Sequence, residues 1–163
     1  MATLGNILAR KGGTAMTGRE VTLTIPVPSA QGGKPVVESA MVLLLPVSEA
    51  RKAAAFRAAE AYVAECERIA AETGQPSTAP SREDERALRF MCEAMHDAED
   101  ARKFFVDSDK VNTFRDVVVA EQMRLLLAEY DQLITDEYAE IRSKAELAQM
   151  KAQAHETFQP GQG

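Results

Sequence analysis

The stretch 109–156, DKVNTFRDVVVAEQMRLLLAEYDQLITDEYAEIRSKAELAQMKAQAHE, decides the fold of this chain. Its apolar residues recur at intervals of three and four, which predicts an amphipathic helical region. The predicted apolar side contains Val111, Phe114, Val118, Met123, Leu126, Leu127, Tyr130, Leu133, Ile134, Tyr138 and Ile141. A helix with so apolar a side is not stable alone in water, so the rest of the chain or another protein must cover it.

The run Val117-Val118-Val119 predicts a break in this helical region, because consecutive β-branched side chains strain a helix. We therefore expect a short helix over residues 109–118, with Ser108 as its N-cap, and a long helix over residues 120–155.

The long helix is predicted to change character at about Ile141. Before this residue we expect core positions, whereas from Arg142 onward the apolar residues become sparse. We interpret this last part as an exposed helical extension and predict that it binds a partner. Its candidate contact residues are Leu147 and Met150.

A β-hairpin is predicted over residues 19–47. The first strand alternates apolar with polar residues, and its apolar positions are Val21, Leu23, Ile25 and Val27. Pro26 lacks a backbone donor, which indicates either an edge strand or the end of the strand. The second strand, residues 36–47, ends in a segment that is apolar on both faces, so Leu44 is a candidate contact with another chain. Two strands alone are marginal in water, so the hairpin must pack on helices or pair with a neighbouring subunit.

Two more helices are predicted over residues 48–73 and 82–96, with Ser48 and Ser81 as their N-caps. The first helix has an apolar seam at 3-4-3-4-3 spacing. The seam contains Phe56, Ala59, Val63, Cys66, Ala70 and Thr73. One interpretation is an ordinary core-facing helix. The other is close helix packing across a subunit interface, which makes Phe56 and Val63 candidate partner contacts.

Together these segments predict one α+β, mostly α-helical domain over residues 19–156, with a flexible leader at 1–18 and a disordered tail at 157–163. Of the 163 residues, 45% are hydrophobic but only 6% are aromatic and none is Trp, so we expect a thin core and some apolar surface for a partner. A net charge of −6 argues against nucleic-acid binding. We see no signal peptide and no apolar run long enough to span a membrane.

The sequence contains no recognisable catalytic, cofactor or metal motif. Glu93, His96, Asp97 and Asp100 are expected on one solvated helical face, because no second Glu-x-x-His motif accompanies them. The two cysteines lie on apolar faces without metal-ligand spacing, which indicates buried small hydrophobic residues in a reducing compartment. We therefore expect a non-enzymatic binding or assembly protein.

The order of features resembles the tail assembly chaperones of long-tailed bacteriophages, over residues 19–141. The likeness lies in residues 85–91 (ERALRFM), an acidic loop at 96–100 and the pair Phe104-Phe105. It continues in the capped segment 108–111 (SDKV), in Leu126 with Tyr130, and in the segment 43–50 (LLLPVSEA), where the hairpin leads into a helix.

The resemblance implies a protein that binds the tape-measure protein and helps to recruit tail-tube subunits around it. It also implies action in the host cytoplasm, absence from the mature virion and a possible longer form made by translational frameshifting. Two alternatives remain open. One is a structural virion protein, such as a tail or head-completion subunit, that forms rings through its hairpin. The other is a small acidic homodimeric adaptor or secretion chaperone.

Overall fold

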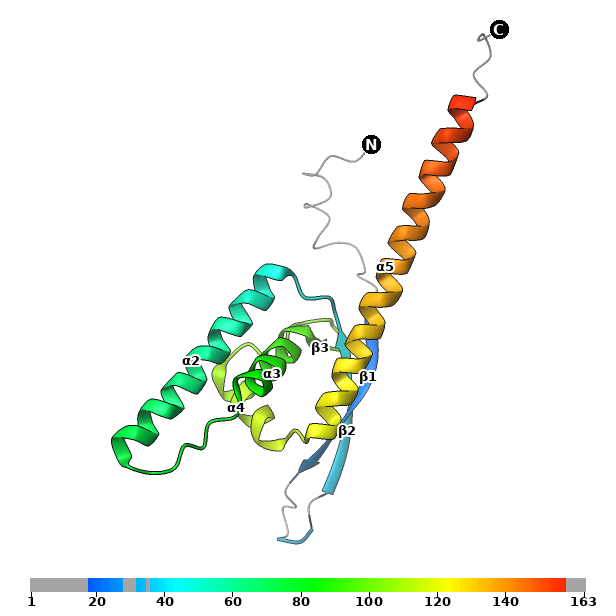
Figure 1. Cartoon of the computed structure of the whole chain (residues 1–163). Coiled ribbons are helices and arrows are strands. Elements are labelled where there is room, and N and C mark those ends of the chain that lie inside the picture. The colour runs from blue at the N-terminus through cyan, green and yellow to red at the C-terminus, as the bar shows by residue number, and fades with distance from the viewer. Residues whose placement is uncertain (1–17, 28–31, 35, 158–163) are drawn as a thin grey trace.

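The computed structural model of the chain describes residues 18–27, 32–34 and 36–157 (Figure 1). Over these residues the fold is α+β and mostly α-helical, as the sequence predicted. The elements are β1 (Arg19–Val27), β2 (Val36–Leu44), α2 (Glu49–Thr73), α3 (Arg82–Ala94), β3 (Met95–Asp97), α4 (Ser108–Val117) and α5 (Ala120–Thr157). The predicted leader, except Gly18, and the tail from residue 158 lie outside the described residues.

The sheet has three antiparallel strands in the order β1-β2-β3, whereas the sequence predicted only the hairpin. The helix predicted over residues 82–96 was expected to lead into an acidic loop. Instead α3 ends at Ala94, and β3 pairs with the buried end of β2 at Val42, Leu43 and Leu44. Leu45 N also donates to Ala94 O over 2.9 Å. The extended conformation thus satisfies backbone groups at the buried end of β2, which a longer helix would leave without these partners.

Helix α5 packs its first half against β1, which is the edge strand of the sheet (Figure 1). The backbone N–H of Thr24 donates to Gln122 Oε1 over 3.4 Å, and Arg19 forms an ion pair with Glu129. Backbone groups two residues apart on a strand point to the same side, so an N–H at position 26 would point away from β2, as that of Thr24 does. Pro26 therefore removes no hydrogen bond between β1 and β2. The edge position that Pro26 indicated as one alternative is therefore confirmed.

The core lies between the sheet, α3 and the first half of α5. Its side chains with almost no exposure include Leu44, Met91, Met95 and Leu126. The apolar side predicted for the last two helices is confirmed for Phe114, Leu126, Tyr130 and Leu133, which are buried. It is wrong for Tyr138 and Ile141, which are 70% and 63% exposed. Near these residues α5 passes the end of the sheet and continues alone (Figure 1), and none of the other described elements covers their side chains.

The break between the last two helices is confirmed at Val118 and Val119, but the N-cap of α4 is not the predicted Ser108. The backbone N–H of Lys110 donates to the Asp107 carboxylate over 2.9 Å, and Ser108 is the first helical residue. The N-caps predicted at Ser48 and Ser81 are confirmed by bonds from Arg51 N and Asp84 N.

Replacement of Asp107 by Ala is expected to lower the free energy of unfolding by ~1 kcal/mol, because α4 loses its capping acceptor. The control Ser108→Ala should change it by less than ~0.5 kcal/mol, because surface changes without such a partner are usually this small. Urea denaturation followed by circular dichroism measures both values. Equal losses in the two variants would contradict the assignment of the cap to Asp107.

Candidate protein-binding surface

The second half of α5 extends away from the body of the molecule (Figure 1). Residues 135–157 span about 34 Å at 1.5 Å per residue. Four large apolar side chains lie exposed on it: Tyr138, Ile141, Leu147 and Met150, with exposed fractions of 70%, 63%, 54% and 65%. An exposed apolar group of this extent marks a binding surface more often than an isolated surface residue does.

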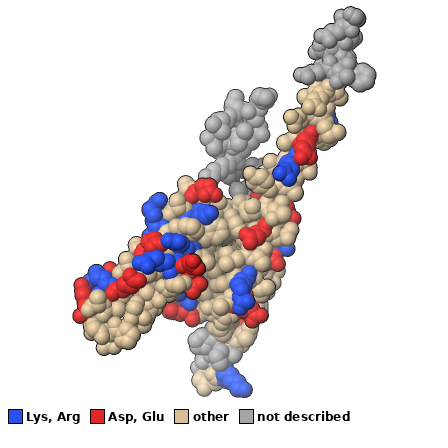
Figure 2. Space-filling model, in the orientation of Figure 1, with Lys and Arg blue, Asp and Glu red and all other residues tan. Residues whose placement is uncertain are grey.

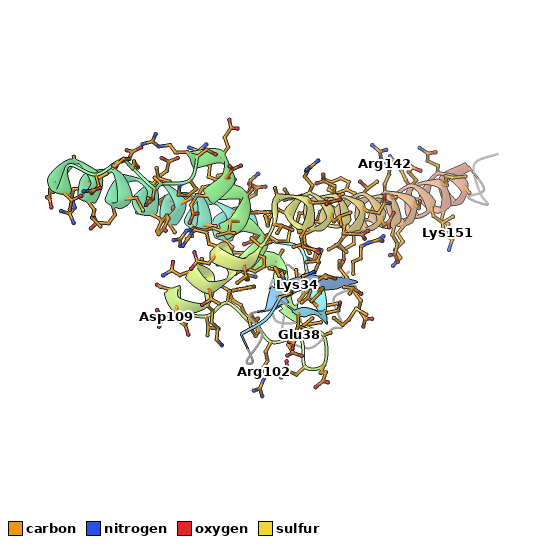
Figure 3. The ribbon with its side chains drawn as sticks, turned by 90° about the horizontal axis from the view of Figure 1, so that it is seen from below. Lys34, Glu38, Arg102, Asp109, Arg142 and Lys151 are labelled. Atoms are coloured by element: carbon orange, nitrogen blue, oxygen red, sulfur yellow. The ribbon has the colours of Figure 1, made fainter. Side chains whose placement is uncertain are left out.

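The exposed apolar side chains do not form a single stripe around α5. At 100° per residue, Ile141 lies about 60° from Tyr138, whereas Leu147 lies about 180° from it. Charged and other polar residues and alanines separate them along the helix, and Figure 3 shows Arg142 and Lys151 on opposite sides of the helix. One intrahelical ion pair, Lys144 with Glu140 at 3.0 Å, supports the helix itself. The exposed half of α5 therefore offers apolar contacts on more than one side.

The structure separates the five predicted partner contacts into two groups. Leu147 and Met150 are exposed, and Phe56 is half-buried with Lys52 and Arg86 near its ring. Leu44 and Val63 are 0% and 2% exposed, so the prediction that they contact another chain is wrong for this fold.

The physical reason is that each of these two side chains already has an apolar environment within the chain. Leu44 belongs to the core between the sheet and the helices. Val63 lies on α2, which packs along α3, and the neighbouring buried positions Ala55 and Ala59 are small enough to let the two helices approach closely.

A second surface feature is an apolar groove of about 690 Å³ between the sheet, α4 and the loop before α4. Leu23, Ile25 and Val42 line it from the sheet, Phe114 lines it from α4, and Phe104 from the loop. Phe105 is buried and Phe104 is 50% exposed, which confirms the expectation that at least one of the pair is core. The sequence did not predict this groove, because its lining comes from segments far apart in the chain.

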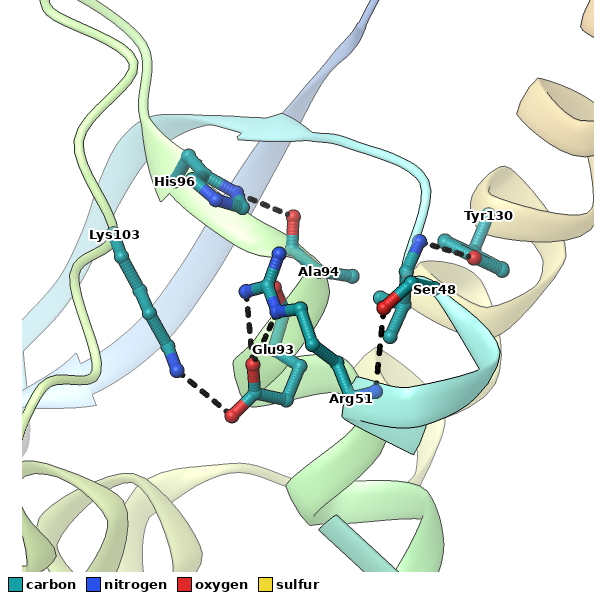
Figure 4. Close-up of polar contacts among 8 residues, drawn as sticks. Ser48, Arg51, Glu93, Ala94, His96, Lys103 and Tyr130 are labelled. Atoms are coloured by element: carbon teal, nitrogen blue, oxygen red, sulfur yellow. Dashed lines mark hydrogen bonds and ion pairs between the residues drawn. The ribbon is translucent and has the colours of Figure 1, made fainter. Parts of the chain in front are cut away.

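The residues considered as a polar helical face are arranged differently from the prediction (Figure 4). His96 is 7% exposed on β3, and its Nδ1 lies 2.9 Å from Ala94 O. Glu93 bonds to Arg51 on α2 and to Lys103 on the loop. Burial alone would raise the pKa of Glu93, but hydrogen bonds from Lys103 and Arg51 outweigh it and hold the pKa below its ordinary value. This network joins three segments of the fold.

Glu85 is a buried charged residue in the first turn of α3. It is 1% exposed, and its carboxylate accepts from Arg89 Nε over 2.9 Å and from Arg115 Nε over 2.8 Å. The Arg115 guanidinium also lies 3.7 Å from the centre of the Tyr62 ring. The cluster ties α2, α3 and α4 together. The only sequence signal for it is Arg89, four residues after Glu85.

The charges on the face seen in Figure 2 are mixed, with Lys, Arg, Asp and Glu interspersed over the helices. Within the described ranges, no group of three or more His, Cys, Asp or Glu residues is placed to hold a metal ion. None of the described helices combines the length and the apolar character needed to cross a membrane.

The two cysteines are expected to differ in reactivity. Cys92 is 4% exposed, and burial raises the pKa of its thiol from the ordinary 9.0 to about 12, whereas Cys66 is partly exposed. At pH 8, iodoacetamide should therefore label Cys66 well before Cys92, as peptide mass spectrometry can measure. Equal labelling rates at pH 8 would contradict the burial of Cys92.

The raised pKa of Cys92 also has a consequence for stability. Because the folded thiol holds its proton more tightly than the unfolded one, Cys92 should stabilise the fold less as pH rises from about 9 towards 12.

Comparison of this chain with protein-family models, curated proteins and solved structures found no match.

Proposed function

We propose that this chain is a non-enzymatic phage tail assembly chaperone that binds the tape-measure protein and helps to recruit tail-tube subunits. In this proposal it acts in the host cytoplasm and leaves before the virion matures. The resemblance of residues 19–141 to this class of chaperones suggests the partners. The observation that carries the proposal is the exposed half of α5, with Tyr138, Ile141, Leu147 and Met150 open to solvent.

The physical argument concerns what such a surface can bind. A long helical partner with an apolar side aggregates in water, and an exposed amphipathic helix can cover that side through contacts at helical spacing. Apolar groups on more than one side of α5 suit a partner that wraps around it or several helices that pack along it. The net charge of −6 helps to keep the resulting complex soluble.

Co-expression with the tape-measure protein of the same genome tests the proposal. The chain should raise the soluble fraction of that protein, and the double variant Ile141→Ser, Met150→Ser should lose most of this effect. The matched control, Ile69→Ser with Val119→Ser, also removes two exposed apolar side chains but leaves the exposed half of α5 intact. An unchanged soluble fraction with the wild-type chain would refute the proposed function.

One observation favours the alternative of a structural virion subunit. Among the described residues, residues 36–41 of β2 have no strand on the side of β3, and such an edge can pair with another protein of the virion. Mass spectrometry of purified particles distinguishes the two functions. A virion subunit should be present in many copies per particle, whereas a chaperone should be absent.

A further inference from the structure

Strand β2 has an unpaired backbone edge next to an apolar groove. β1 pairs with β2 from Val36 to Leu44, whereas β3 pairs only from Val42 to Leu44. In the part of the chain that the structure describes, no strand lies beside residues 36–41 on the β3 side, and all six residues are exposed.

The register shows which backbone groups point outward from this edge. Leu45 N donates to Ala94 O on the β3 side, and backbone groups alternate between the two sides along an antiparallel strand. Val37, Ser39 and Met41 therefore direct their N–H and C=O groups towards the open side. The opposite strand agrees with this assignment, because Thr24, which faces Ser39, directs its N–H away from β2 to Gln122.

The groove described above, of about 690 Å³, borders this edge, since Ala40 and Met41 belong to its lining. On β2, Ala40 and Val42 lie on the core face of the sheet, which they share with the paired Leu23 of β1. A strand added beside β2, end to end with β3, would place alternate side chains on that face. Those side chains would enter the groove between the sheet and Phe114 of α4.

We propose that this edge and groove bind an extended segment of a partner protein. The segment has an apolar residue at every second position and a basic residue at each end. The segment adds to the sheet as a strand, so that main-chain hydrogen bonds hold it and the groove takes its apolar side chains. This site is separate from the exposed half of α5, and the inference does not depend on the function proposed for that helix.

The charges around the groove favour a basic segment. Three carboxylates, Asp97, Asp107 and Asp109, line it against one cation, Lys110. Glu38 adds a fourth carboxylate two residues from Ala40 on the same face of β2, and Figure 3 shows Glu38 on β2 and Asp109 on α4. A second copy of this chain would bring the same carboxylates together across the new pair of strands, which is unfavourable. The edge therefore suits a different protein better than it suits a second copy.

A synthetic peptide, Lys-Val-Thr-Val-Thr-Val-Lys with blocked ends, tests the proposal with the full chain. Hydrogen exchange followed by NMR should show that the peptide slows exchange at least ~10-fold at Val37, Ser39 and Met41. The amides of Glu38 and Ala40 face β1 and should change little. The same peptide with N-methyl groups at every valine and threonine is the control, because it lacks the donors for strand addition in either strand direction and should not bind.

Variants of the chain locate the site. Ser39→Pro removes one outward N–H, as Pro26 does on β1, and should weaken peptide binding at least ~10-fold, whereas Ser39→Ala should not. Asp109→Asn should weaken it less and keep the fold, so the test stands even if Ser39→Pro unfolds. The variant Ile141→Ser, Met150→Ser should bind the peptide normally, which separates this site from that of the proposed function.

Three results would overturn the proposal. The first is no detectable binding of the peptide at a concentration of ~1 mM. The second is equal binding of the N-methylated control. The third is protection of Val37, Ser39 and Met41 that grows with protein concentration without peptide, because a second copy would then occupy the edge.

Discussion

The Leu126→Ala variant is expected to lose ~3 kcal/mol of unfolding free energy, within the range measured for buried leucines. Leu126 is 0% exposed at the point where α5 packs on the sheet, and its truncation leaves a cavity among well-packed neighbours. Urea denaturation followed by circular dichroism measures the loss.

Leu125 provides the matched control because it is adjacent and of the same type but 56% exposed. Leu125→Ala should change the unfolding free energy by less than ~0.5 kcal/mol. Similar losses for the two variants would mean that α5 is rotated on the sheet relative to the structure described above.

The Glu85→Gln variant is expected to lose ~3–5 kcal/mol of unfolding free energy. The substitution keeps the volume of the side chain but removes the charge that pairs with Arg89 and Arg115, whose side chains are only 20% and 13% exposed. Two largely buried guanidinium groups would then share a neutral acceptor. Thermal and urea denaturation should both report the loss.

Glu60 is the matched control for this charge cluster, since it also lies between two arginines, Arg82 and Arg86, but is 41% exposed. Glu60→Gln should cost less than ~1 kcal/mol, because water screens an exposed ion pair. The difference between the two variants measures the effect of burial. If Glu85→Gln and Glu60→Gln behave alike, the Glu85 cluster is hydrated in solution.

The sequence predicted the elements whose signals are local. The alternation of residues 19–25 predicted β1, the serine caps predicted the starts of α2 and α3, and three consecutive valines predicted the gap before α5. β3 was missed because three residues are too few to show alternation, and Met95 also continues the apolar stripe of α3.

The predicted binding residues were partly wrong because an apolar side chain does not reveal which surface covers it. Leu44 and Val63 are covered by the chain's own helices, whereas Tyr138 and Ile141 continue the apolar pattern of α5 after the sheet has ended. The point at which α5 is no longer covered depends on where the sheet and the other helices end, which the sequence of α5 does not show. Glu85 was missed for a similar reason, because its partner Arg115 is 30 residues away and no local pattern connects them.

Two hydrogen bonds fix the rotation of α5 about its own axis. Gln122 accepts from Thr24 N, and Tyr130 accepts through its hydroxyl from Val47 N over 2.9 Å, two turns further along the helix. Because α5 continues without a break to Thr157, this rotation also sets the direction in which each exposed side chain faces. One alanine inserted after Ile134 would turn all later residues by about 100° and leave the packed half in place. The direction in which the exposed side chains of α5 face relative to the body of the protein can thus be changed without changing the stability of the fold.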